Sequence, residues 1–236
     1  ADIAKQEKMW FHIDGAYGGL VGMLDSKKHL YRGIDQADSV ALDFHKWLYQ
    51  PFEAGCLLVK DWGTLKNAYF KKADYLETAS AATENRVDFN EHYFQLSRNS
   101  KALKAWMSIK AYGLDAIKAM IQKDVDLAVF LADEVEKTTD FRLKARSDMA
   151  IACFQYTGGE TDEDLIIKLN KALIPELEKD GRVFIMSTKL NGEFVIRACI
   201  INHRKTEATT LYLLDVIREV GQDVLSQIKN KIPTNA

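Results

Sequence analysis

Asp14 is the first residue whose type and position could support chemistry. It closes the apolar run Met9-Trp10-Phe11-His12-Ile13 and precedes the glycine-rich stretch Gly15-Ala16-Tyr17-Gly18-Gly19. A short buried strand followed by such a turn is typical of the carboxyl edge of an open α/β sheet, where these folds bind ligands. A carboxylate at that edge can keep the ring nitrogen of a bound pyridine protonated. The same carboxylate could instead serve only as a helix N-cap or a turn residue.

Lys46 is the second such residue, 32 positions after Asp14 (46 minus 14). It lies in Asp43-Phe44-His45-Lys46-Trp47-Leu48, directly after a second short apolar run. An amine in apolar surroundings is favoured in its neutral form and can then form an imine with an aldehyde or ketone. Alternatively, Lys46 could be a surface lysine whose stem covers apolar side chains. The two residues in this order favour the chemical interpretation more strongly than either does alone.

The apolar pattern predicts which elements position these residues. Residues 9–13, 39–43 and 55–59 are short runs typical of buried strands, and the third is apolar enough to be covered on both faces. Residues 100–137 have helical periodicity that breaks near Gly113, and residues 67–98 form a long polar stretch typical of a functional loop.

The remainder of the chain predicts alternating strands and helices. The expected strands span residues 149–154, 183–187 and 194–200, with Asn191-Gly192 as a hairpin turn between the last two. The expected helices span residues 162–178 and 206–229. The class is therefore α/β followed by an α+β region, with one domain predicted at residues 1–137 and a smaller one at residues 138–236.

Composition excludes several classes of function. The net charge of −2 comes without a long basic stretch, which disfavours nucleic acid as a partner, and no apolar run approaches the ~20 residues that span a bilayer. The histidines have no metal-ligand spacing, so no metal is expected. Three widely spaced cysteines indicate reduced thiols and a cytoplasmic protein. A start within a helix, without a capping residue, suggests a fragment of a longer chain.

Several segments resemble the group II pyridoxal-phosphate-dependent decarboxylases, which include aromatic-amino-acid, glutamate, histidine and diaminobutyrate decarboxylases. His12-Ile13-Asp14-Gly15-Ala16-Tyr17-Gly18-Gly19 resembles the family segment HVDAAYGG, and Ser39 to Val59 resembles the segment centred on its His-Lys-Trp. Weaker similarity is found at Gln95-Leu96-Ser97-Arg98, Leu103-Lys104-Ala105-Trp106 and Phe194-Val195-Ile196-Arg197. The resemblance runs from Trp10 to about Gln227.

The resemblance implies a fold-type I enzyme, in which this chain is the C-terminal part of an aspartate-aminotransferase-like large domain plus a small α+β domain. It implies pyridoxal 5'-phosphate as the cofactor, bound to Lys46 as an internal aldimine. It further implies that Asp14 pairs with the pyridine nitrogen, that Ala16 lies against the ring and that His45 contributes to the phosphate site.

The same resemblance assigns roles to three further residues. Tyr75 matches a loop tyrosine that donates a proton to the substrate carbon after carbon dioxide leaves, and that loop reaches a neighbouring subunit, which implies a homodimer. Arg98 matches an arginine that supports the site, and Arg197 matches one that can meet the substrate carboxylate. Tyr75 could instead be a loop anchor, and Arg197 could belong to a buried structural ion pair.

Two departures from the family pattern stand out. The family usually has Asn-Pro before its His-Lys pair, where this chain has Asp43-Phe44. Only 13 residues precede Asp14, so the N-terminal half that completes the cofactor and substrate sites in the family is expected as a partner outside this sequence.

The implied activity is decarboxylation of an L-amino acid, with an aromatic substrate favoured, to an amine and carbon dioxide. It would place the protein among the lyases of amino-acid metabolism. Glutamate or diamino-acid decarboxylation, an aldehyde synthase, aminotransferase or desulfurase-like lyase, and a non-catalytic assembly partner remain alternatives.

Overall fold

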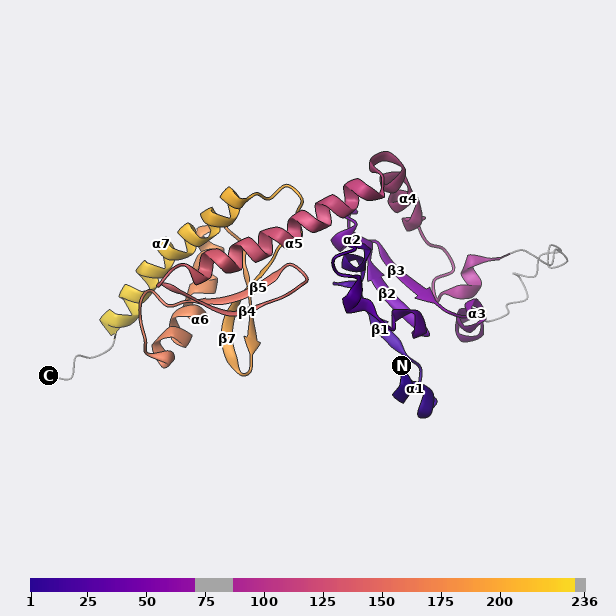
Figure 1. Cartoon of the computed structure of the whole chain (residues 1–236), viewed down its shortest axis with the longest axis horizontal. Coiled ribbons are helices and arrows are strands. Elements are labelled where there is room, and N and C mark those ends of the chain that lie inside the picture. Colours follow the sequence, from indigo (N-terminus) through magenta and orange to yellow (C-terminus); the bar gives the residue numbers. More distant parts are fainter. Residues whose placement is uncertain (71–86, 232–236) are drawn as a thin grey trace. The chain divides into compact units, whose positions relative to one another are not determined.

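The computed structural model describes residues 1–70 and 87–231, and the chain forms two compact units, Ala1–Ile117 and Lys118–Ala236 (Figure 1). The boundary between the two units, after Ile117, falls near the start of a long helix. The domain boundary between residues 137 and 138 that the sequence suggested stays a prediction. Each unit has a sheet of its own, and each is described separately below.

The first unit is built on a sheet with the strand order β1-β2-β3 in the described residues. Its regular elements are α1 (Asp2–Gln6), β1 (His12–Asp14), η1 (Gly19–Met23), η2 (Lys28–Tyr31), η3 (Ile34–Gln36), β2 (Ser39–Asp43), α2 (Phe44–Trp47), β3 (Gly55–Val59), α3 (Trp62–Tyr69), η6 (Phe89–His92) and α4 (Lys101–Tyr112).

The pair β1–β2 is parallel, with Asp14 beside Ala41, and the pair β2–β3 is antiparallel, with Asp43 beside Gly55. All three predicted strands are confirmed, although β1 begins at His12 rather than at Met9. Asp14 and Asp43 therefore end neighbouring parallel strands at the same edge of the sheet.

Strand β3 differs from its prediction in one respect. Its apolar sequence predicted a strand covered on both faces, but Leu57 and Leu58 are 47% and 53% exposed. Neighbouring residues of a strand point to opposite faces of the sheet. Within the part of the chain that the structure describes, β3 thus leaves apolar side chains uncovered on both of its faces.

The predicted break near Gly113 separates α4 from the long helix α5 (Leu114–Glu136). Gly113 has a φ of 81°, in the region where a residue with a Cβ is strained. A helix cannot continue through this backbone geometry, so α4 and α5 are distinct elements. Apart from its first turn, α5 belongs to the second unit.

The second unit is an antiparallel sheet with helices packed against it (Figure 1). Its strand order in the described residues is β4-β5-β7-β6. Besides most of α5, its elements are β4 (Phe141–Arg146), β5 (Ile151–Tyr156), α6 (Glu163–Asp180), β6 (Met186–Leu190), β7 (Glu193–Cys199) and α7 (Glu207–Lys231). The hairpin predicted at Asn191-Gly192 is confirmed, since these residues have φ values of 50° and 87° and join β6 to β7.

Strand β4 was absent from the sequence-based prediction. Its sequence alternates apolar and charged residues, which is the pattern of a half-buried strand that the prediction overlooked. In the structure each charge has a partner: Arg142 pairs with Glu163, Lys144 with Glu193, and Arg146 with Asp133 and Glu136 of α5. Those partners come from other elements, so the sequence of β4 itself gives no sign of them.

The core of the second unit lies between the sheet and helix α6. Leu169, Leu173 and Leu177 of α6 are fully buried, as are Phe154 of β5 and Ile196 of β7. These leucines recur every four residues and so share one helix face, which is why the sequence predicted this helix.

Candidate active site

The turn after β1 holds Asp14 close to the end of β2. The Asp14 Oδ1 atom accepts a hydrogen bond of 3.1 Å from the Ala16 backbone N–H, so the carboxylate also has the turn-forming role considered above. A Cβ on Gly15 would lie 2.9 Å from the Ala41 backbone oxygen, and one on Gly19 would lie 2.3 Å from Leu42 Cδ2. Because both glycines lack a side chain, the turn packs directly on β2. The Asp14 side chain remains exposed at this edge.

Lys46 lies on α2, the short helix that follows β2. Its Nζ atom forms an ion pair of 2.8 Å with Asp43 Oδ2, and its side chain is 35% exposed. The next residue, Trp47, is fully buried and packs edge-to-face on Tyr17 of the turn after β1, with ring centroids 5.8 Å apart. Trp47 thus anchors α2 to that turn while the Lys46 amine stays accessible.

The orientation of His45 follows from one backbone hydrogen bond. The Ala54 N–H donates to His45 Nδ1 over 3.1 Å, so in the neutral ring the hydrogen is on Nε2. Nε2 lies 3.6 Å from Asp43 Oδ2, the same oxygen that pairs with Lys46. The ring also packs edge-to-face on Phe52, with centroids 4.8 Å apart.

The loop that carries Ala54 is held by α4. Lys104 Nζ donates to the backbone oxygens of Pro51 and Glu53, over 2.8 and 2.7 Å. Lys101 forms an ion pair of 2.5 Å with the Glu53 carboxylate, and this hydrogen bond and charge lower the pKa of Glu53. Helix α4 therefore positions His45 indirectly, through the loop and the Ala54 N–H.

The remaining predicted site residues lie elsewhere. Arg98 is exposed, with its guanidinium 4.3 Å from the centroid of the Tyr93 ring. Arg197 lies on β7 of the second unit, half-buried and opposite Cys153 and Met186 in the sheet, and no ion pair of Arg197 is found within residues 1–70 and 87–231. Tyr75 lies outside the described residues. The structure thus brings Asp14, Ala16, His45 and Lys46 to one sheet edge.

Sequence reasoning noted Asp43 only as a departure from the family pattern and missed its contact with Lys46. The signal was present, because an aspartate three residues before a lysine is a neighbour on a helix surface. It also missed Ser39, whose Oγ accepts a hydrogen bond of 2.8 Å from Trp10 Nε1 and lies 2.7 Å from His12 Nδ1. These bonds join the start of β2 to the segment containing β1.

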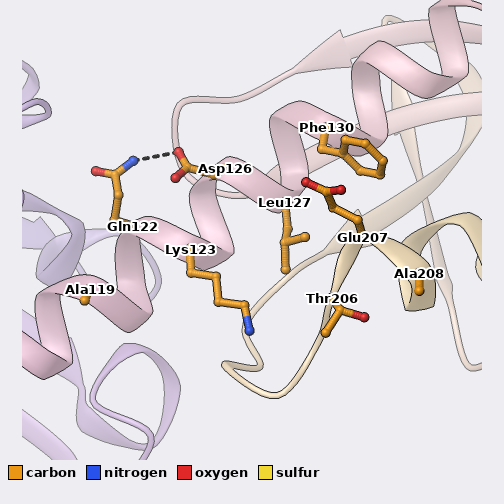
Figure 2. A pocket seen from close by; sticks show the side chains of 9 residues that line it. All are labelled: Ala119, Gln122, Lys123, Asp126, Leu127, Phe130, Thr206, Glu207 and Ala208. Carbon is orange, nitrogen blue, oxygen red and sulfur yellow. Dashed lines mark hydrogen bonds between the residues drawn. The ribbon is translucent and has the colours of Figure 1, made fainter.

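A separate hollow of about 620 Å³ lies in the second unit, between α5 and the start of α7 (Figure 2). Lys123 and Leu127 of α5 line it together with Thr206 just before α7. The Lys123 ammonium donates to the His203 backbone oxygen over 2.9 Å, so its charge is already engaged. None of the sequence-predicted site residues lines this hollow.

The site at the sheet edge has the groups that bind an aldehyde-bearing pyridine. Lys46 offers a primary amine that solvent can reach, and Asp14 offers an exposed carboxylate at the end of the neighbouring parallel strand. Ala16, which follows Asp14 by two residues, adds only a methyl group to this edge. An amine, a carboxylate and an imidazole at one edge of an α/β sheet fit the class of pyridoxal-dependent enzymes.

The chain belongs to the pyridoxal-dependent decarboxylase family, because its residues 1–157 match the pyridoxal-dependent decarboxylase conserved domain. The cofactor of that family is pyridoxal 5'-phosphate, as the sequence resemblance implied. An aromatic-L-amino-acid decarboxylase of Bacillus atrophaeus is 32% identical over 229 residues, which is 95% of this chain and 47% of that protein. Tryptophan decarboxylase 2 of Oryza sativa subsp. japonica is 29% identical over 198 residues, covering 84% of this chain and 40% of that protein.

Solved structures show the same fold. The crystal structure of Oryza sativa TDC with PLP and tryptamine superposes with a TM-score of 0.88 at 24% identity, over 95% of this chain and 46% of that one. The predicted fold class, a fold-type I α/β enzyme, is therefore confirmed. The chain spans about half the length of the relatives that it matches. Among the described helices, none is both long and apolar enough to cross a bilayer.

Proposed function

We propose that the protein containing this chain decarboxylates an L-amino acid with pyridoxal 5'-phosphate, giving the amine and carbon dioxide. The observation that carries the proposal is the placement of the Lys46 amine and the Asp14 carboxylate at the ends of adjacent parallel strands, in a chain of this family. The curated relatives are decarboxylases, which supports this reaction over aldehyde synthesis or transamination.

Each residue at the sheet edge has one task in this proposal. Lys46 holds the cofactor covalently through its amine, and Asp14 holds a proton on the pyridine nitrogen. When bound, pyridoxal phosphate would supply an electron sink for the substrate carbon that loses carbon dioxide. Ala16 would border the ring, where a larger side chain would not fit. His45 contributes to the phosphate site, with the ring orientation that the Ala54 N–H imposes.

Three residues complete the proposed site. Tyr75 donates the proton that replaces carbon dioxide on the substrate carbon. Arg98 supports the site from the segment before α4, and Arg197 binds the substrate carboxylate. Arg197 is half-buried and has no ion pair within the described part of the chain, which supports that last assignment.

An aromatic amino acid is the proposed substrate. The names of the relatives support this choice, since they include aromatic-L-amino-acid, tryptophan and tyrosine decarboxylases. Glutamate and diamino acids are the alternatives. They can be separated by measuring amine products from a panel of amino acids.

We also propose that the protein is a cytoplasmic homodimer whose N-terminal half covers the sheet of the first unit. The uncovered Leu57 and Leu58 on opposite faces of β3 support such a covering part, and the relatives are about twice as long as this chain. Cys56 and Cys153 form no disulfide within the described residues, which supports a reducing compartment.

Borohydride reduction tests the assignment of Lys46. The full-length protein containing this chain, incubated with pyridoxal phosphate and reduced, should carry the pyridoxyl group on the peptide that contains Lys46. The variant Lys46→Ala should lose both this label and the release of carbon dioxide, whereas Lys28→Ala, which alters a lysine in a surface ion pair with Asp25, should keep both. A label confined to other lysines would contradict the proposal.

A further inference from the structure

In this structure the Asp43 carboxylate forms an ion pair with the Lys46 amine. The pair has an N–O distance of 2.8 Å, and both side chains are partly buried, with exposures of 35% for Lys46 and 23% for Asp43. Partial burial and a short distance give a charge-assisted hydrogen bond rather than a loose surface contact. The amine that would hold the cofactor is therefore engaged with a carboxylate three residues before it.

The Asp43 carboxylate does not stabilise helix α2 by capping its N-terminus. Asp43 is the N-cap residue of α2, yet its side chain makes no capping hydrogen bond. Its neighbour across the sheet is Gly55, and a Cβ there would lie 3.6 Å from Asp43 Oδ1. Because glycine has no side chain, this neighbour offers the carboxylate no other side-chain partner. The charged partners that the structure gives Asp43 are Lys46 and His45, both on α2.

We propose that Asp43 acts as a latch on Lys46, and that the Asp43–Lys46 ion pair must open before Lys46 can bind the cofactor aldehyde. This inference rests on the proposed function of Lys46. An ammonium held by a carboxylate has no lone pair to attack a carbonyl carbon. When the ammonium reacts, a carbon–nitrogen double bond replaces the aldehyde C=O bond. Two hydrogens of the ammonium leave with the oxygen as water, and the third stays on nitrogen.

His45 gives the released carboxylate a second partner. Its Nε2–H already lies 3.6 Å from Asp43 Oδ2, so a small shift allows Asp43 to bond the ring after Lys46 leaves. The carboxylate then keeps a hydrogen-bond partner, so breaking its ion pair with Lys46 costs little free energy. The effect of the latch should accordingly be modest, on the order of threefold in rate, as for other partly exposed ion pairs.

Reductive labelling of cofactor-free protein tests the latch. Wild type, Asp43→Asn and Asp25→Asn are each treated with a low concentration of aldehyde and cyanoborohydride at one pH, and the initial rate of Lys46 modification is followed by peptide mass spectrometry. Asn has the shape of Asp but no charge. Asp25 forms the same type of ion pair with Lys28 at an exposed position, so Asp25→Asn is the matched control.

The aldehyde is either pyridoxal phosphate or pyridoxal, which lacks the phosphate. The latch predicts that Asp43→Asn labels Lys46 about threefold faster with both aldehydes, while Asp25→Asn labels at the wild-type rate. High salt should raise the wild-type rate relative to that of Asp43→Asn, because it screens the ion pair.

Three outcomes would overturn the latch while Lys46 remains the labelled residue. These are equal rates in wild type and Asp43→Asn, a slower variant, and an acceleration seen only with pyridoxal phosphate, which would locate the effect of Asp43 at the phosphate. If Lys46 were unlabelled in every protein, the proposed function would fail together with the latch.

Discussion

At the scale of single residues, the candidate site depends on small side chains as much as on charged ones. Gly15 and Gly19 allow the turn after β1 to approach β2 within contact distance, and this approach keeps Asp14 beside the segment that carries Lys46. The sequence predicted both chemical residues from their position after apolar runs. The three-residue spacing of Asp43 and Lys46 indicated their ion pair, although it was overlooked. The approach of Asp43 to His45 could not be predicted, because that distance depends on how α2 turns after β2.

Asp14→Asn should separate chemistry from stability. Asparagine can still accept the hydrogen bond from the Ala16 N–H, so the free energy of unfolding should change by less than about 0.5 kcal/mol. It cannot hold a proton on the pyridine nitrogen through a full charge, so decarboxylation by the full-length protein should fall about 100-fold, as when one electrostatic contact is removed from an active site. Amine release and urea unfolding measure the two effects. Wild-type turnover in this variant would remove Asp14 from the proposed mechanism.

At the scale of elements, a buried polar side chain joins α6 to β5. The Asn170 Oδ1 atom accepts from the Tyr156 N–H over 3.0 Å, and its Nδ2 donates to the backbone oxygens of Tyr156 and Ile166, each over 2.8 Å. The ladder between β5 and β7 ends at Phe154, although β7 itself continues to Glu193, and Asn170 supplies the backbone hydrogen bonds of Tyr156 beyond the end of that ladder. The leucine pattern of α6 predicted the helix, but its lone asparagine on the buried face gave no sign of this role.

Asn170→Ala should be strongly destabilising. It leaves the N–H and C=O groups of Tyr156 buried without these bonds, at a cost of about 2–4 kcal/mol in the free energy of unfolding. Asn202→Ala is the control, because Asn202 is exposed and its side chain accepts a local hydrogen bond from the Arg204 N–H, and it should cost less than about 1 kcal/mol. Urea unfolding followed by circular dichroism compares the two variants. Equal losses would show that the bridge from α6 to β5 contributes little.

At the scale of the whole molecule, both units contain thiol and phenol groups that are at least partly buried. Burial raises the pKa of Cys56 and Tyr31 in the first unit and that of Cys153 and Tyr156 in the second. Below the ordinary pKa values, these groups are neutral whether the chain is folded or unfolded. As the pH rises, the unfolded chain loses these protons first, so the folded state loses stability through the range up to its own raised pKa values.

The urea midpoint should therefore fall between pH 8 and pH 10. Tyr156→Phe removes one of these groups, and its midpoint should fall less over the same range than that of wild type. A midpoint that stayed constant or rose in wild type would contradict the expected linkage.

Strand β3 also has a consequence for how this chain behaves when it is prepared by itself. Residues Cys56 to Val59 carry no charge and no proline, and within the described residues β3 lies at an edge of its sheet. An exposed edge strand of this kind can pair with the same strand of another copy through backbone hydrogen bonds. Residues 1–236 produced without the rest of the protein should therefore aggregate more readily than the full-length protein.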